Sequence, residues 1–337
     1  NMLKKLLIKI RKITIFGNLL VIMNNRRSFI TGIKSTSLSK NEKKFIKKYN
    51  PWGIILFSRN IVSIPQIKKL TDEIKKIFND KNYPILIDQE GGRVNRLKNF
   101  LNTDRLTSEY FGKLYKKDKK KFDYYYNIFV NKTSHLLKLI GANINTLPVL
   151  DVRAKGASNI IGDRSFSNDF RLVSKIGDVC IKSFHKNKIG TVIKHIPGHG
   201  LAKVDSHKLT PIIKTKYKEL IKNDFSAFKN KKCFLAMTAH IIYEDIDPLY
   251  ATTHSKKVIH LIRKIIKFNN ILMSDDISMK SLKYSTKQNT LKAFSAGCNL
   301  VLHCNGNYQE MIIVAENSPL LSKFIIKKTS QFYKILS

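Results

Sequence analysis

Two adjacent aspartates follow an apolar run in the segment ILMSDDIS, residues 271–278. A carboxylate that ends a buried strand can act as a nucleophile, bind a metal ion or accept hydrogen bonds from substrate hydroxyls. Neighbouring side chains of an extended strand point to opposite faces. We therefore expect only one of Asp275 and Asp276 to face a site, and the other to cap the following helix.

A second segment suited to chemistry is TVIKHIPGHGLAKVDSHKLTP, residues 191–211. Asp205 and His207 are two positions apart, so in an extended backbone their side chains lie on the same side. The carboxylate can then accept a hydrogen bond from one imidazole nitrogen and leave the other nitrogen to exchange protons. The spacing is typical of an assisted acid/base pair, although a solvent-exposed loop histidine would show the same pattern.

The histidines of this segment also allow a metal-based hypothesis. His195 and His199 have the spacing of zinc ligands on a helix, but Pro197 and Gly198 lie between them and exclude a helix. A metal-dependent barrel hydrolase that uses His195, His199 and His240 therefore remains an alternative. The favoured interpretation includes no metal and no cofactor.

A carboxylate nucleophile together with a proton-transferring group is what retaining glycoside cleavage requires. Retaining enzymes usually pair two carboxylates, whereas here the proton donor would be a histidine supported by Asp205. A neutral acid/base avoids placing a second negative charge beside the nucleophile, and a neighbouring aspartate keeps its pKa useful near neutral pH.

Short apolar runs alternate with amphipathic stretches from Ser28 onward. Continuous apolar strands between helices indicate a parallel sheet covered on both faces. We predict strands at 28–33, 53–57, 84–88, 143–148, 190–195, 233–240, 271–276 and 298–303, and helices at 64–78, 120–139, 169–187, 214–229, 256–267 and 307–316. This pattern predicts an α/β fold, a single (β/α)8 TIM-type barrel over residues 26–337. A doubly wound open sheet is the second choice, because no glycine-rich dinucleotide motif follows an early strand.

The barrel places chemistry at the carboxyl ends of its strands. Polar clusters close several of the apolar runs: 88–93, 194–195, His240 and 274–276. Charged residues are uncommon at the ends of buried strands unless they have a function. Their presence at the ends of several strands therefore predicts that these clusters meet in one site.

The charge balance is extreme, since 62 Lys and Arg residues against 24 Asp and Glu give a formal net charge of +38. Such a surplus can indicate a nucleic-acid or membrane-surface partner. The lysines, however, are spread along the whole chain beside Ile and Asn, as an AT-rich coding sequence would produce. We therefore predict no specific nucleic-acid partner.

The remaining composition indicates an ordinary intracellular protein. The four cysteines include no C-x-x-C pair, which favours buried free thiols over a zinc site or disulfides. No apolar run approaches the about 18 residues of a membrane span. Residues 1–25 combine a basic start with an interrupted apolar stretch and no cleavage site, so we expect an extension outside the fold. A cytoplasmic monomer is expected.

Six ordered blocks resemble the β-N-acetylhexosaminidases of glycoside hydrolase family 3, the single-domain bacterial type that acts in cell-wall recycling. They are GIILFSRN (53–60), IDQEGGRVNRL (87–97), LPVLDV with IGDRSFSND (147–169), KHIPGHG to DSH (194–207), MTAHIIYEDIDP with SDDISM (237–279) and AGCNLVLHCNG (296–306). The resemblance extends from Ser28 to the end of the barrel.

This resemblance implies roles for individual residues. Asp275 matches the nucleophile that forms a covalent glycosyl intermediate, His207 the general acid/base and Asp205 its partner. The residues that match the binding site for N-acetylglucosamine (GlcNAc) are Asp88, Arg96, Arg164, Lys194 and His195.

The implied activity is a retaining exo-β-N-acetylglucosaminidase that removes terminal GlcNAc from peptidoglycan fragments, the anhydro-muropeptides. The expected partner is thus a small carbohydrate. A phosphorolytic variant stays open, because a neutral histidine tolerates phosphate better than a carboxylate would.

Overall fold

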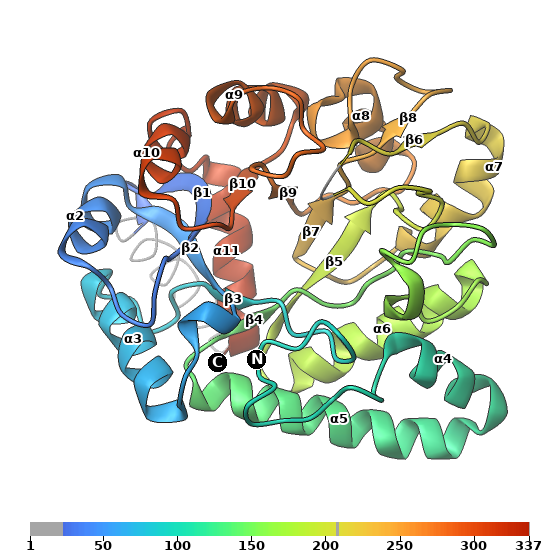
Figure 1. Ribbon diagram of the computed structural model, residues 1–337, viewed down its shortest axis with the longest axis horizontal. Helices are drawn as coiled ribbons and strands as arrows, with labels where there is room; N and C mark the ends of the chain where they lie inside the picture. The colour runs from blue at the N-terminus through green and yellow to red at the C-terminus, as the bar shows by residue number, and fades with distance from the viewer. Residues whose placement is uncertain (1–22, 207–208, 337) are drawn as a thin grey trace, which may run out of the picture.

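Eight parallel strands close into a barrel in the computed structural model, which describes residues 23–206 and 209–336 (Figure 1). Every predicted strand is present. Around the barrel they follow chain order: β1 (Arg27–Gly32), β2 (Pro51–Leu56), β3 (Ile85–Ile87), β4 (Ile144–Asn145), β5 (Gly190–Ile196), β7 (Leu235–Thr238), β9 (Ile271–Asp276) and β10 (Leu300–His303). The predicted (β/α)8 barrel is confirmed.

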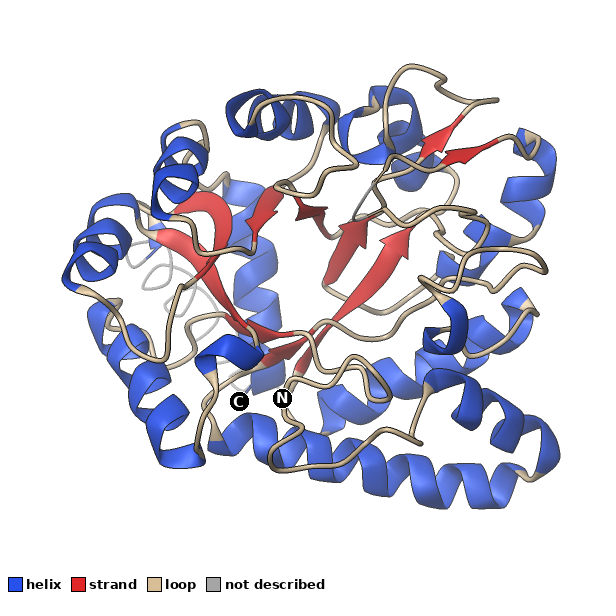
Figure 2. Cartoon of the chain, in the orientation of Figure 1, coloured by secondary structure: helices blue, strands red, loops and turns tan. Residues whose placement is uncertain are grey.

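Helices surround the strands on the outside (Figure 2). They are α2 (Lys40–Tyr49), α3 (Ile64–Ile77), α4 (Ser108–Lys117), α5 (Lys119–Leu139), α6 (Phe170–Lys186), α7 (Tyr217–Lys222), α8 (Lys256–Lys264), α9 (Thr286–Ala296), α10 (Tyr308–Glu316) and α11 (Lys323–Leu336). In α3 the Ser63 hydroxyl caps the first turn, and Ile67, Leu70 and Ile74 recur at helical spacing on the buried face. No helix in the described ranges is long and apolar enough to cross a membrane.

The prediction of one helix over 214–229 is wrong in part. The chain there forms α7, is interrupted at Asn223, and continues as a 3-10 helix, Asp224–Phe228. Asn223 has φ −110° and ψ −86°, outside the helical region, which ends α7 after six residues. A two-stranded parallel sheet, β6 (Ile212–Ile213) with β8 (Ile242–Tyr243), lies beside this region.

Alternation along the strands divides the apolar residues into two core layers. Ile30 of β1 and Ile55 of β2 point into the barrel, whereas Phe29 and Ile54 pack under the outer helices. Helix α11 lies across one end of the barrel and contributes apolar side chains to the inner layer (Figure 1). This layer also contains Met23, which is buried although it was predicted to belong to the extension. Residues 1–22 of that extension lie outside the described residues.

Two strands carry an irregularity at the end where the polar clusters lie. On β5, Lys194 and Ile196 pair with consecutive residues of β7, and on β9, Met273 and Asp276 pair with Leu300 and Leu302 of β10. Such bulges change the direction in which side chains point. Consecutive residues of β5 and of β9 can therefore face the same side.

Candidate active site

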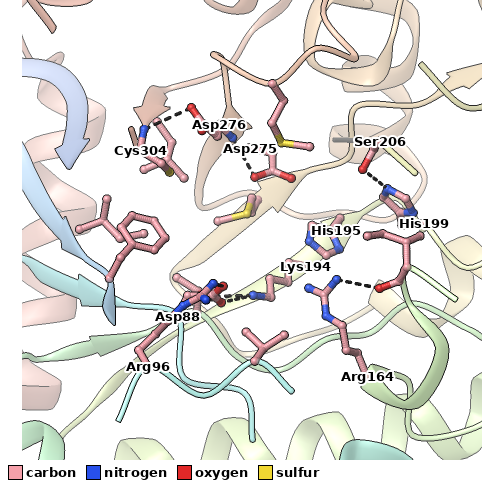
Figure 3. Close-up of a pocket in the computed structure, with 18 residues that line it drawn as sticks. Asp88, Arg96, Arg164, Lys194, His195, His199, Ser206, Asp275, Asp276 and Cys304 are labelled. Atoms are coloured by element: carbon pink, nitrogen blue, oxygen red, sulfur yellow. Dashed lines mark hydrogen bonds and ion pairs between the residues drawn. The ribbon is translucent and has the colours of Figure 1, made fainter. Parts of the chain in front are cut away.

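A cavity of about 200 Å³ lies at the carboxyl ends of the barrel strands (Figure 3). All five residues predicted to bind the sugar line it, together with Asp275. Asp276, from the predicted cluster 274–276, and His199, from the metal hypothesis, also line it. Three further polar lining residues were not predicted: Thr146, Ser206 and Cys304. Ile55, Met237 and Leu302 of the inner core layer are among the apolar lining residues, so the cavity is continuous with the interior of the barrel.

Asp88, which directly follows β3, holds two cations at the cavity. Its Oδ1 accepts a hydrogen bond from Lys194 Nζ at 2.5 Å, and its Oδ2 accepts one from Arg96 Nη2 at 2.9 Å. Thr146 Oγ1 also donates to Oδ1 at 2.5 Å. Burial alone would raise the pKa of Asp88, but Lys194 and Arg96 outweigh burial and hold the pKa well below its usual range. Asp88 is therefore a charged, oriented acceptor.

Glu90 is a second buried carboxylate in this network and was not assigned a role from sequence. It accepts from Arg164 Nε at 2.7 Å and from Arg164 Nη2 at 2.8 Å, a bidentate pair. Lys194 Nζ lies 2.5 Å from its Oε1. Burial would raise the pKa of Glu90, yet Arg164 and Lys194 lower it overall. Glu90 thus orients the two cations, and its position in the block IDQEGGRVNRL was the available signal.

Asp275 differs from the other carboxylates of the cavity in its partners. Its Oδ1 accepts one backbone N–H, from Asp276 at 2.8 Å, and no cation among the described residues forms an ion pair with it. Burial would raise the pKa of Asp275, but the nearby His195 and His240 together lower it. The side chain points into the cavity (Figure 3). Asp275 therefore presents an ionised, largely uncompensated oxygen to the cavity.

Asp276 corrects the expectation that one of the two aspartates caps a helix. Its carboxylate accepts from Ser278 N, Ser278 Oγ and Cys304 N, at 3.1, 2.8 and 3.2 Å. Helix α9 is capped by Ser285 instead. Both aspartates line the cavity because the irregularity of β9 interrupts strict alternation. Asp276 joins the end of β9 to the end of β10.

His195 is held by a buried aspartate that the sequence did not single out. Its Nδ1 lies 2.7 Å from Oδ2 of Asp151, which has no solvent exposure. Burial would raise the pKa of Asp151, but His195 and its hydrogen bonds lower it overall. An ionised carboxylate only accepts, so Nδ1 is the donor and Nε2 of His195 remains for a ligand. Asp151 belongs to the block LPVLDV, which follows β4 in the chain.

The predicted acid/base pair is described in part. Asp205 is half-buried, and its carbonyl accepts from Leu209 N at 3.0 Å. His207 lies outside the described residues, so its role stays a prediction. Near the start of this loop, a side chain at Gly200 would lie 1.7 Å from the carbonyl oxygen of Val152. Gly200 therefore allows close packing of two backbones.

The three histidines of the metal hypothesis are engaged separately. His240 lies 2.7 Å by Nδ1 from Thr253 Oγ1 and 2.9 Å by Nε2 from the carbonyl of Asp276. Within residues 23–206 and 209–336, no group of three His, Cys, Asp or Glu side chains is placed to hold a metal ion. The four cysteines are free; Cys180, Cys233 and Cys298 are buried, and only Cys304 reaches the cavity.

Asp224 gives a prediction about stability and pH. It is 7% exposed and packs against Gly198 of the loop. Burial, with Asp151 and Glu219 nearby, raises the pKa of Asp224 from 3.8 to about 7. As pH rises from 4 to 7, the unfolded chain loses this proton before the folded protein does, so stability falls. We expect Asp224→Asn to be more stable than wild type by up to about 4 kcal/mol at pH 8 and by less than half of that, about 1.5 kcal/mol, at pH 5.

Urea unfolding at both pH values measures this difference. The control is Asp104→Asn, which makes the same chemical change at an exposed position. An Asp224→Asn variant whose stability relative to wild type is the same at pH 5 and pH 8 would contradict the assignment of a raised pKa.

Comparison with known proteins agrees with this architecture. Residues 16–330 match the family model described as "Glycosyl hydrolase family 3 N terminal domain". A beta-hexosaminidase from Methylobacillus flagellatus is 30% identical over 280 residues, 81% of this chain and 79% of that protein. One from Haemophilus ducreyi is 31% identical over 286 residues, 82% and 80% of the two chains. The crystal structure of NagZ from Neisseria gonorrhoeae with N-trifluoroacetyl-D-glucosamine has a TM-score of 0.82 and 26% identity, covering 91% of this chain and 90% of that one.

A closed parallel barrel with an ionised aspartate and a sugar-sized polar cavity at its carboxyl end defines a barrel hydrolase of the glycosidase class. The chain belongs to glycosyl hydrolase family 3. The resemblance predicted from the sequence blocks is confirmed, and so is the prediction of a glycoside hydrolase.

Proposed function

We propose that the protein is a retaining exo-β-N-acetylglucosaminidase. The observation that carries this proposal is Asp275, an ionised carboxylate that faces the cavity without an ion-pair partner among the described residues. A nucleophile needs such an oxygen, whereas Asp88 and Glu90 are neutralised by cations. The beta-hexosaminidase relatives, and the acylated glucosamine bound to the Neisseria protein, support GlcNAc as the sugar.

The proposed reaction has two steps. Asp275 attacks the anomeric carbon and forms a glycosyl ester, while His207 gives a proton to the departing oxygen. Water then attacks the same carbon from the opposite side of the ester; His207 takes its proton, and the Asp275 carboxylate leaves. Asp205 supports the imidazole in both steps. Two displacements at one carbon retain the β configuration.

Sugar recognition is assigned to the charged network of the cavity. Asp88 keeps lone pairs for sugar hydroxyls, Lys194 and Arg96 donate, and Arg164 and His195 complete the set. Each of these groups also discriminates against a sugar that lacks its partner, because a buried polar group would be left unsatisfied. Anhydro-muropeptides are the proposed natural substrate, and a cytoplasmic monomer is the proposed form.

Proton NMR of the first product tests this function. With an aryl N-acetyl-β-glucosaminide, the β-anomer of GlcNAc should appear first and then mutarotate. Initial release of the α-anomer would overturn the retaining mechanism. Added phosphate should give no GlcNAc 1-phosphate; its formation would replace hydrolysis with phosphorolysis. Mass spectrometry of products from anhydro-muropeptides tests the natural substrate.

His207→Ala yields a prediction that depends on the leaving group. The kcat/KM for a GlcNAc disaccharide should fall about 10²- to 10⁴-fold, because its sugar alkoxide needs a proton as it leaves. The kcat/KM for a 2,4-dinitrophenyl glycoside should change little, since that phenolate leaves unprotonated. Steady-state kinetics on both substrates measures the difference. Equal losses on the two substrates would count against an acid role.

A further inference from the structure

A buried carboxylate anchors the beginning of the loop that carries Asp205 and His207. Asp151 Oδ1 accepts the backbone N–H of His195 at 3.1 Å and that of His199 at 2.7 Å, while Oδ2 binds the His195 ring. Asp151 thus receives three donors from the end of β5 and the residues after it. His199 is thereby fixed to the barrel through its backbone.

The His199 ring then reaches forward to the loop. Its Nε2 lies 3.0 Å from Ser206 Oγ, and both residues are buried, at 3% and 4% exposed. The ring packs edge-on against His195, with centroids 5.4 Å apart. Nδ1 of His199 is buried with no hydrogen-bond partner among the described residues, so Ser206 is the ring's polar contact there. Burial first, and then His195, lowers the pKa of His199 to about 4, which keeps the ring neutral at pH 7.

Ser206 lies in the chain between Asp205 and His207, the supporting carboxylate and the proposed acid/base. One residue of extended chain spans about 3.3–3.6 Å, so a fixed Ser206 restricts where both neighbours can lie. The backbone between His199 and Ser206 has its own supports: Ala154 N donates to Gly200 O at 3.3 Å, and Ser158 N donates to Ala202 O at 2.9 Å. These bonds hold the beginning of the loop, whereas the His199–Ser206 contact holds its far end.

We propose that His199 and Ser206 are positioning residues, and that their hydrogen bond fixes Ser206 at the cavity and so restrains its neighbours in the chain, Asp205 and His207. This inference rests on the proposed roles of those two residues. The bond connects the acid/base segment through His199 to Asp151, the same carboxylate that orients His195. One buried anion therefore sets the geometry of a sugar-binding group and of the proton-transferring loop together.

The test is Ser206→Ala, which removes the hydroxyl with little change in volume. We expect kcat/KM for a GlcNAc disaccharide to fall about three- to tenfold, the effect of one hydrogen bond. The 2,4-dinitrophenyl glycoside should react at the wild-type kcat/KM, because its departure needs no acid. Ser206→Thr keeps a hydroxyl and should restore most of the disaccharide activity. Ser330→Ala on α11, outside the cavity lining, is the matched control.

A double-mutant cycle separates positioning from direct contact with substrate. His199→Asn should reproduce the leaving-group-dependent loss, and adding Ser206→Ala to it should cause no further loss, because the two changes remove the same bond. Additive losses, or a Ser206→Ala enzyme equally impaired on both substrates, would overturn the inference. A Ser206→Ala enzyme with the wild-type kcat/KM on both substrates would also overturn the inference.

The outcome for the wild-type enzyme distinguishes this inference from the proposed function. Wild-type activity on both substrates with an unaffected Ser206→Ala variant removes the positioning role and leaves the glycosidase assignment intact. A wild-type protein that hydrolyses neither substrate overturns the proposed function, and the inference falls with it.

Discussion

Asp275→Ala is expected to lower kcat/KM on an aryl N-acetyl-β-glucosaminide by at least about 10⁴-fold, because it removes the proposed nucleophile and the other carboxylates of the described cavity lining, Asp88 and Asp276, have partners. The neighbouring carboxylates are already bound: Asp88 by Lys194 and Arg96, and Asp276 by Ser278 and Cys304. The variant should fold, since the Asp275 side chain accepts only one backbone hydrogen bond among the described residues. Initial rates with 4-nitrophenyl N-acetyl-β-glucosaminide measure the loss.

Azide provides a positive test of the same assignment. In Asp275→Ala the removed carboxylate leaves space for a small anion, which can attack the anomeric carbon and displace the activated phenolate. The product should be the α-glycosyl azide, because one displacement inverts a β-glycoside. Asp276→Asn is the control, and azide should not change its product. An Asp275→Ala enzyme that retains substantial turnover without azide would remove Asp275 as the nucleophile.

Lys194→Met is expected to be the most destabilising single change in the site. The Lys194 side chain is 3% exposed, and its ammonium group contacts both Asp88 and Glu90 at 2.5 Å. Its removal leaves the half-buried Asp88 and the buried Glu90 near each other, with Arg96 and Arg164 as their remaining cationic partners among the described residues. Breaking a buried charge pair from one side typically costs about 3–5 kcal/mol. We expect a loss of that size in the free energy of unfolding at pH 7.

The pH dependence gives this prediction a second measurement. In the wild type, the pKa values of Asp88 and Glu90 are lowered, so they contribute stability above their ordinary pKa, near 4, and lose it as pH falls further. Lys194→Met removes part of that contribution. The deficit should therefore be largest at neutral pH and smaller at pH 4.5, because in the variant burial raises the pKa of carboxyls that have lost the ammonium group, and they can take up protons there.

Urea unfolding at both pH values measures the deficit. Lys113→Met is the matched control, because that lysine is 74% exposed and pairs only with Glu109 across one helical turn. Its stability should equal that of wild type within error. A Lys194→Met protein as stable as this control at pH 7 would show that the buried network contributes no stability.

The sequence was most informative where a physical rule acts locally. Apolar runs such as 190–195 and 271–276 are long enough to form buried strands, and each run ends in residues that can carry a charge. The helices were less visible: the helical segments named from the sequence do not include α2, α4, α9 and α11. The alternation rule failed at Asp275 and Asp276, because a strand irregularity depends on the neighbouring strand.

The sequence by itself therefore determined the barrel, the family and the residues predicted to bind the sugar, all of which line the cavity. The order of apolar and charged residues along the chain predicts both the eight buried strands and the charged groups at their ends. Only the tertiary structure decided which charged side chains form ion pairs and hydrogen bonds with one another. It placed Glu90 between Arg164 and Lys194, joined Asp151 to both His195 and His199, and left Asp275 without a cation among the described residues. These partners come from different strands, and distances between strands are fixed only when the barrel closes.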